Sequence, residues 1–394
     1  MVAVADLRFA DTATLDELLA ARGEGRMVRS PRGWEVLGYE DSLEALRHPQ
    51  LLRAKLFLTR ADKLGLGPGF ARSYMERMLN TQEGEQRTHL RTPTAKVLAP
   101  RVVRKLAEEV HTIVHRLLDE VADPSDVDLL NEVCWRLPPA VYCVMFGAPM
   151  EHAGTIARLS DSLLGPILSQ DSSRIQELED AHHEAFEFVI RQIEDRRGHL
   201  GEDFTSFLVE QEMSGYFTRQ ELYDTGVNIL EASVDNTVHQ GAEVIGRLLE
   251  RPDDWRRVLA DRDLVRNAIE EVTRMWPRFR THMRYAAEDI ELFGEDLSYD
   301  DIVFVNVEAA HHDERVFEDP LTFDVARPVH PGPLVYGQGQ YSCLGQHLAR
   351  LEMSELLNAI LDRYPHARLI EPFQEHAGPF VREATRLRVS LTGE

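Results

Sequence analysis

Residues 336–345, Tyr-Gly-Gln-Gly-Gln-Tyr-Ser-Cys-Leu-Gly, lead directly into a long helical pattern. After Cys343, apolar residues recur at the spacing of a helix that buries one face: Leu344, Leu348, Leu351, Leu356, Leu357, Ile360 and Leu361. Cys343 is therefore expected at the start of a helix, where unpaired N–H groups and the helix dipole favour a thiolate. Gly337, Gly339 and Gly345 allow tight turns beside a flat, bulky group. The arrangement suits a metal ligand, although an isolated cysteine in a glycine-rich turn is more often a buried structural residue.

The length and composition of the chain indicate one large domain, residues 1–394. The sequence contains no Pro/Gly/Ser-rich linker, repeat or low-complexity block that would divide it. With 43% hydrophobic residues it can bury an ample core, and no apolar run approaches the length of a membrane span. Residues 1–8 lack the basic and apolar segments of a secretory signal.

Charge and cysteine content restrict the partners and the compartment. A formal net charge of −23 opposes binding to nucleic acid and to anionic membranes, so neither is expected as a partner. Three cysteines give no disulfide framework, which fits a reducing cytoplasm. Cys134 and Cys143 lie in an apolar segment and are expected in the core.

Helical patterns dominate the chain. They cover residues 106–196 and 222–249, the second of which is expected to be the longest internal helix. Strand patterns are short, at residues 34–37, 289–292 and 302–307. The fold class predicted is mainly α with a smaller β region. The adjacent His182 and His183 face different directions on a helix, so solvated surface is expected for them rather than a metal site.

The cysteine stretch resembles the haem-binding loop of the cytochrome P-450 family, Phe-Gly-x-Gly-x-His/Arg-x-Cys-x-Gly. The resemblance extends from about Arg26 to the end of the chain and rests on four motifs in the family's order. It implies a P-450 fold holding haem b between the long helix and the cysteine loop, with Cys343 as the metal ligand and Gly337, Tyr341 and Gly345 beside the cofactor. Tyr341 replaces a His or Arg that commonly holds a haem propionate, and a phenol brings no positive charge.

Three arginines match the family's propionate-binding positions. Arg87 and Arg91, four residues apart, share a helix face in a segment that resembles the propionate-binding helix. Arg284 matches the propionate-binding arginine of a later strand. On composition alone such arginines are more often solvated surface residues.

Residues 231–237, Glu-Ala-Ser-Val-Asp-Asn-Thr, resemble the family's oxygen-activating sequence. The match makes Asp235 the acid and puts Asn236 in the threonine position, with Thr237 after it. An amide cannot relay protons through a hydroxyl, but it can hold a water or a substrate hydroxyl. The match also implies a set of substrate contacts: Asn228, Glu231, Ala232, Phe279, Arg280 and His282. Polar groups there favour a polar substrate, unless the register turns them toward solvent.

Glu271 and Arg274 match the family's Glu-x-x-Arg motif, which by itself is an ordinary helix ion pair. Arg327, between this motif and the cysteine loop, is the candidate that completes a buried ion triad. Such a group is better assigned to fixing the fold than to chemistry.

The resemblance implies a haem-thiolate monooxygenase that uses O2 to hydroxylate, demethylate or otherwise oxidise a small organic substrate. No cysteine cluster or Gly-rich nucleotide fingerprint is present, so electrons are expected from NAD(P)H through a separate ferredoxin or flavodoxin and its reductase. Two alternatives share the same ligand, a peroxide-driven haem oxidase and a non-catalytic haem sensor. The substituted Asn236 keeps the sensor open, and the peroxide-driven oxidase stays open beside it.

Overall fold

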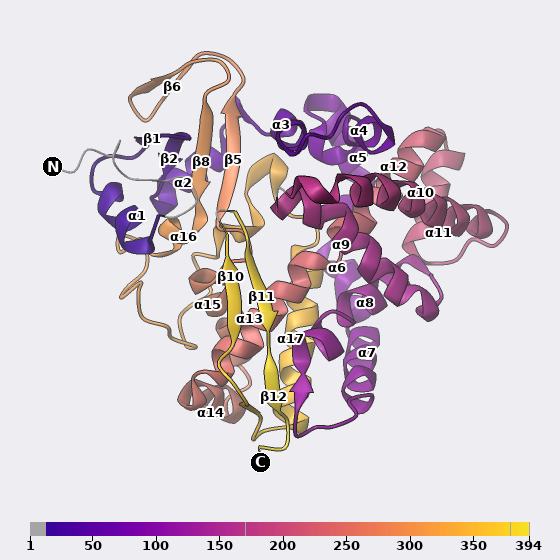
Figure 1. Cartoon of the computed structure of the whole chain (residues 1–394), viewed down its shortest axis with the longest axis vertical. Coiled ribbons are helices and arrows are strands. Elements are labelled where there is room, and N and C mark those ends of the chain that lie inside the picture. Colours follow the sequence, from indigo (N-terminus) through magenta and orange to yellow (C-terminus); the bar gives the residue numbers. More distant parts are fainter. Residues whose placement is uncertain (1–12, 170, 379, 394) are drawn as a thin grey trace. The chain divides into compact units, whose positions relative to one another are not determined.

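The computed structural model describes residues 13–169, 171–378 and 380–393, in two compact units that alternate along the chain (Figure 1). The sheet unit comprises the described residues up to Arg53, with Ala242–Cys343 and Ala367–Leu387. The helical unit comprises Ala54–Gly241, Leu344–His366 and the described residues from Arg388 onward. That residues 1–394 form one domain stays a prediction.

A five-stranded sheet organises the sheet unit, in the order β1-β2-β8-β5-β3. Its strands are β1 (Val28–Ser30), β2 (Gly33–Val36), β3 (Leu51–Leu52), β5 (Thr281–Ala286) and β8 (Ile302–Asn306). β2 and β8 run parallel, with Trp34 opposite Val303, and the other pairs are antiparallel. β5 and β8 lie side by side along their length (Figure 1), so Arg284 pairs with Val303 in the middle of the sheet.

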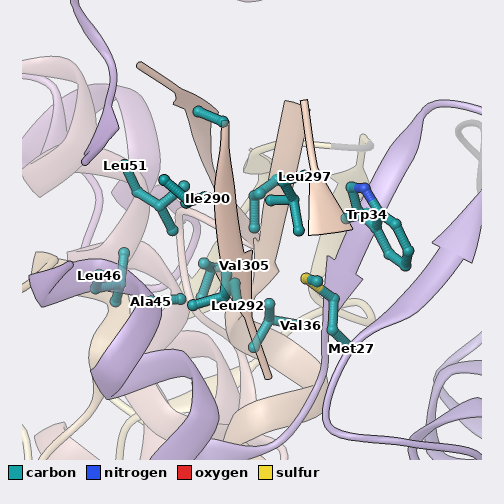
Figure 2. Close-up of a cluster of buried hydrophobic side chains, with 12 residues drawn as sticks. Met27, Trp34, Val36, Ala45, Leu46, Leu51, Ile290, Leu292, Leu297 and Val305 are labelled. Carbon is teal, nitrogen blue, oxygen red and sulfur yellow. The ribbon is translucent and has the colours of Figure 1, made fainter. Parts of the chain in front are cut away.

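A cluster of apolar side chains covers this sheet (Figure 2). Val36 and Val305 come from neighbouring strands, while Ala45 and Leu46 come from helix α2 (Tyr39–Arg47). Ile290, Leu292 and Leu297 of the small hairpin β6 (Ile290–Leu292) and β7 (Glu295–Leu297) complete the cluster. Burying these side chains is the main favourable term that holds α2 and the hairpin on the sheet.

The sheet unit contains several further helices and strands. They are α1 (Leu15–Arg22), α14 (Pro252–Ala260), α15 (Leu264–Met275), α16 (Val307–His311), β9 (Arg368–Leu369), β10 (Gln374–Ala377), β11 (Arg382–Arg386) and the 3-10 turns Leu334–Tyr336 and Gly339–Tyr341. The strands expected at residues 34–37, 289–292 and 302–307 correspond to β2, β6 and β8, within one or two residues at their ends.

The helical unit is built from helices that bury one apolar face each. They are α3 (Ala54–Leu64), α4 (Phe70–Met75), α5 (Gly84–Val97), α6 (Pro100–Val103), α7 (Ala107–Asp119), α8 (Leu137–Phe146), α9 (Ala153–Ser169), α10 (Ile175–Arg197), α11 (Phe204–Met213), α12 (Arg219–Ala232), α17 (Gln346–Arg363) and the first part of α13 (Asp235–Leu249). Short elements between them are the 3-10 turns Leu79–Thr81, Arg104–Leu106, Met150–His152 and Ser172–Arg174, the π turn Leu130–Cys134, and the paired strands β4 (Val127–Asp128) and β12 (Arg388–Ser390). Among the described residues, no helix is both long and apolar enough to cross a membrane.

The single long helix expected over residues 222–249 is wrong, because the structure breaks it into α12 and α13 at Ser233 and Val234. The Ser233 hydroxyl donates to the carbonyl of Ile229, and the Ser233 N–H reaches the carbonyl of Leu230 instead. A serine that bonds back to the carbonyl four residues earlier bends a helix. The break gives Asp235 the first position of a new helix.

Two further expectations need correction. Cys343 does not start a helix, because its N–H donates to the Tyr336 carbonyl at 2.7 Å within a turn, and α17 begins at Gln346. His182 is not on the surface: it is 0% exposed, packed against Tyr74, and its Nδ1 bonds the Leu178 carbonyl at 2.7 Å. His183 is exposed, as expected.

Candidate active site

The loop before Cys343 is held in a conformation that glycine adopts most readily. Gly337 and Gly339 have φ angles of +65° and +63°. A Cβ atom at Gly337 would lie 3.3 Å from the carbonyl oxygen of Tyr341, which is a tight contact. Since L side chains rarely adopt such angles, other residues at these two positions would strain the turn that carries the cysteine.

The environments of the three cysteines differ, and only Cys343 is exposed. Cys134 and Cys143 are buried, as expected for core residues. Burial raises the pKa of the Cys134 thiol to about 12 and that of Cys143 to about 11, so both stay protonated and inert at neutral pH. Cys343 is thus the one cysteine in the described chain that a metal in the solvent-facing loop can reach.

The ring of Tyr341 lies against two guanidinium groups of the sheet unit. The Cζ atom of Arg284 is 4.8 Å from the ring centroid, and that of Arg53 is 5.2 Å from it. Positive charge is therefore present beside Tyr341, although the residue itself has none. The sequence did not single out Arg53, which follows the two-residue strand β3 and lies in no recognisable motif.

This donor set fits a haem. An exposed cysteine in a glycine-shaped turn offers a sulfur ligand for iron, and the buried Arg284 with Arg53 offers cations for carboxylates. Within the helical unit, α5 supplies two more candidate cations. Arg87 is buried and donates from Nη1 to the Leu79 carbonyl at 2.7 Å, and Arg91 is half-buried.

The break between α12 and α13 gathers polar side chains. Asp235 is buried, and its Oδ1 lies 3.4 Å from Nε2 of His239. The side-chain oxygen of Asn236 is buried and accepts no hydrogen bond from the described residues. Thr237 lines a small cavity of about 10 Å³ with Glu352 of α17, and Ala232 is exposed. The stretch therefore combines acceptors and donors where the helix is interrupted.

Glu231 is a carboxyl group buried in the helical unit. It is 2% exposed, which excludes the alternative that this face of α12 points to solvent. The Tyr74 hydroxyl donates to its Oε2 at 3.1 Å and the Asn228 amide does so at 3.5 Å, while its Oε1 has no partner among the described residues. Burial raises the pKa of Glu231 to about 7.

Tyr74 belongs to α4, a short helix that is attached to α10 and α12. The Glu179 carboxylate of α10 accepts from the first N–H groups of α4, at 2.6 Å from Phe70 and 3.1 Å from Ala71. Phe70 also stacks on His183 with ring centroids 4.2 Å apart. The Tyr74 hydroxyl then joins α4 to Glu231. Sequence reasoning missed Tyr74, which follows the glycine-rich residues 65–69 and lies in no recognisable motif.

A cavity of about 340 Å³ opens beside this cluster, lined by residues of α5 and α12 and the turns near them. Asn228 forms part of its wall, together with Arg77 and Asp224, whose side chains form a two-point ion pair at 2.8 and 3.0 Å. This pair satisfies the charge on that wall. The lining also includes the apolar Leu79 and Leu90.

The remaining predicted substrate contacts lie in the sheet unit. Arg280 donates from Nε to Glu308 at 2.7 Å and from Nη1 to the Gly378 carbonyl at 2.6 Å. His282 contacts the Leu334 carbonyl at 3.1 Å through Nε2, and desolvation lowers the pKa of His282 to about 4. Phe279 stacks on His282 with ring centroids 6.3 Å apart. The guanidinium of Arg280 is thus already paired, and His282 is neutral at neutral pH.

The sheet unit also brings together Glu271, Arg274 and Arg327. Oε2 of Glu271 is 2.7 Å from Nε of Arg274, and Oε1 is 3.0 Å from Nε of Arg327. The N–H of Asp324 donates to the same Oε1 at 3.0 Å. The two guanidinium groups also bond backbone carbonyls, among them Thr322. The group therefore ties α15 to the loop before the cysteine stretch.

Comparison with known proteins gives a consistent result. A family model described as Cytochrome P450 matches residues 145–372. Luteothin monooxygenase of Streptomyces thioluteus is 30% identical over 88% of this chain and 85% of its own length. Nocardicin C N-oxygenase of Nocardia uniformis subsp. tsuyamanensis is 30% identical and covers 94% of each chain. The crystal structure of CalO2 has a TM-score of 0.87 at 24% identity, with 95% of this chain and 94% of that chain covered. That likeness confirms the mainly helical fold with small sheets.

Proposed function

We propose, from the premise that this chain belongs to the cytochrome P450 family, that it oxidises a polar organic substrate with electrons from a separate protein. The chain is a P450 monooxygenase of small substrates, and its family implies haem. The polarity of the substrate and the source of the electrons are the two claims of this proposal that family membership does not show. The cytoplasmic location expected from the cysteine content stays a prediction.

The observation that supports a polar substrate is that Oε1 of Glu231 has no hydrogen-bond partner among the described residues. A buried carboxylate oxygen without a donor is costly, and a substrate amine or hydroxyl supplies the missing hydrogen bond. Asn228, one turn earlier on α12, offers a second polar contact and also lines the 340 Å³ cavity. A sugar derivative, amino acid or amine-bearing natural product fits these groups better than a terpene or fatty acid. A relative named for N-oxygenation agrees with an amine-bearing class.

The proposed cofactor contacts divide by chemistry. Cys343 provides the thiolate ligand, and Gly337, Tyr341 and Gly345 shape the loop around it. The proposed contacts of the haem carboxylates are four guanidinium groups: Arg53, Arg87, Arg91 and Arg284. When bound, the haem supplies the activation of O2.

Protons are proposed to pass through the polar stretch at the helix break. Asp235 connects to bulk protons, and Asn236 holds a water or a substrate hydroxyl through its amide. Thr237 is about 100° further round the helix and is a poor direct substitute. Asn236→Ala is expected to divert reduced cofactor into hydrogen peroxide, whereas Asn236→Thr stays well coupled. The measurement is product formed per reduced cofactor consumed, and equal values in wild type and Asn236→Ala would make this side chain a bystander.

The electron source is proposed to be a ferredoxin or flavodoxin with its reductase, supplied by NAD(P)H. The support is the sequence, which contains no cysteine cluster or Gly-rich nucleotide fingerprint. Peroxide-driven oxidation is the second candidate, favoured by the missing threonine at Asn236. Turnover with peroxide alone, against turnover that requires reduced cofactor and partner proteins, separates the two. Substrate binding without either form of turnover indicates a sensor.

The first test is the absorption spectrum of the reduced CO complex. Thiolate ligation gives a strongly red-shifted band, and Cys343→His is expected to lose both this band and monooxygenase activity. Cys143→Ser is the matched control, because that buried thiol is not a proposed ligand and the band should persist. An unchanged spectrum in Cys343→His would contradict the ligand assignment.

The substrate class is tested by a binding screen read from the haem spin state. Amine-bearing and hydroxyl-rich compounds are expected to bind the wild type and to lose affinity in Glu231→Leu. Tight binding of a plain hydrocarbon, with no loss for polar compounds in Glu231→Leu, would refute the polar substrate.

A further inference from the structure

A histidine lies next to the proposed acid on the same helix. Asp235 and His239 are one turn apart on α13, and both side chains are buried. The distance from Nε2 of His239 to Oδ1 of Asp235 is 3.4 Å. Charged or protonatable groups this close alter each other's protonation, and burial weakens the screening by water.

The ring of His239 packs against an aromatic side chain, and one of its nitrogens has no hydrogen-bond partner among the described residues. Trp135 packs edge-on against it, with ring centroids 5.6 Å apart and an interplanar angle of 85°. Its Nδ1 is buried and has no hydrogen-bond partner among the described residues. A buried ring nitrogen of this kind is a place where an ordered water or an arriving proton completes the hydrogen bonding.

The other titratable groups near this pair are carboxyls. Asp161 of α9 has a raised pKa, chiefly because of burial and further because of the charge on Asp235, while Arg174 opposes the shift. Glu352 of α17 lines the same small cavity as Thr237, and burial raises the pKa of Glu352 well above the ordinary value. Trp135 is neutral. His239 is a basic group in direct contact with Asp235.

We propose that His239 is a positioning residue for Asp235 and passes protons to it. A proton moves from Nε2 of the imidazolium to Oδ1 of Asp235, which leaves a neutral imidazole and a protonated carboxyl. The neutral ring then carries its remaining proton on Nδ1. Exchange with water returns the ring to the Nε2–H tautomer, a further proton from water enters at Nδ1 to regenerate the imidazolium, and the carboxyl that has given up its proton receives again. This inference rests on the proposed role of Asp235 in proton delivery.

Two substitutions separate positioning from proton transfer. In His239→Gln the amide can still donate to Asp235 but cannot titrate, and in His239→Leu both abilities are lost. We expect both variants to turn over roughly a hundredfold more slowly, the lower end of what an acid–base group contributes, and to lose one ionisation from the pH profile. A wild-type rate and pH profile in His239→Gln would overturn the proton-transfer role.

His111→Gln is the matched control. His111 and Glu355 also form a histidine–carboxylate pair, with Nδ1 and Oε2 3.1 Å apart, but the histidine is exposed. The rate, the coupling and the pH profile are expected to match the wild type. The reduced CO spectrum of every variant must show the thiolate band, so that a damaged cofactor site is recognised separately.

A second measurement decides the pairing without turnover. The ring signals of His239 are recorded by NMR in the reduced, CO-bound holoenzyme, in wild type and in Asp235→Asn. Removing the carboxylate that faces Nε2 should shift these signals, while those of the exposed His111 stay constant. Unchanged ring signals of His239 overturn the inference. If the wild type fails to accept electrons from any partner, the proposed electron source is wrong, and the NMR shift still supports the pair.

Discussion

Two buried glutamates in different regions of the molecule have opposite surroundings. Glu271 of the sheet unit has a guanidinium on each carboxylate oxygen and a backbone N–H as well. Glu231 of the helical unit has a phenol and an amide on one oxygen and nothing on the other. A buried carboxylate with two cations is held in place as an ion, whereas one with neutral donors shifts its pKa instead. Glu271 is suited to fixing structure, and Glu231 to meeting a ligand.

The largest effect is expected from Glu271→Ala. The change leaves Arg274 and Arg327 buried around an empty site, at a cost of about 3–5 kcal/mol. The free energy of unfolding and the haem content of the purified protein measure it. Glu120→Ala, at an exposed glutamate paired with the exposed Arg136, should cost far less. A fully loaded Glu271→Ala protein of normal stability would contradict the structural role.

An effect of intermediate size is expected from the pH dependence of Glu231. Its pKa is raised from 4.5 to about 7 in the folded state, so its contribution to stability is complete below pH 4.5 and is lost as pH rises through 7. The loss amounts to about 3 kcal/mol, since one pKa unit corresponds to about 1.4 kcal/mol. Glu231→Gln should remove this dependence. The free energy of unfolding is measured against pH for both proteins. If it depends on pH in the same way in wild type and in Glu231→Gln, the Glu231 carboxyl is in contact with water and the prediction is wrong.

A smaller effect is expected from Tyr74→Phe, which removes the hydroxyl that donates to Glu231 and keeps the ring. The free energy of unfolding is expected to fall by about 1–3 kcal/mol, because the Glu231 carboxylate then keeps only its hydrogen bond from Asn228. The pKa of Glu231 should rise further, since the Tyr74 hydrogen bond lowers it. Tyr216→Phe, at an exposed hydroxyl, is the control. If the two variants have equal stability and binding, the Tyr74 hydroxyl does not hold α4 in place.

The elements that sequence could predict are those set by local spacing. The cysteine loop, the paired arginines of α5 and the strands β2 and β8 all carry their signal within a few residues. Other features depend on side chains brought from distant segments. His182 is buried because α4 lies against it, and Arg53 matters because the sheet brings it to Tyr341. The break at Ser233 escaped prediction since the apolar period continues through it, and a single hydroxyl decides the geometry.

The parallel pairing of β2 with β8 has a consequence for the order of events during synthesis. Trp34 pairs with Val303, and the roughly 270 residues between them need about 13–54 s at 5–20 residues per second. During that interval the β1–β2 hairpin has an unpaired edge, and the long segment Ala54–Gly241 of the helical unit can fold first. A nascent chain of this protein therefore exposes an unpaired, aggregation-prone strand edge for much of its translation. The yield of folded protein in cells should depend on ribosome-associated chaperones more than the stability of the finished protein suggests.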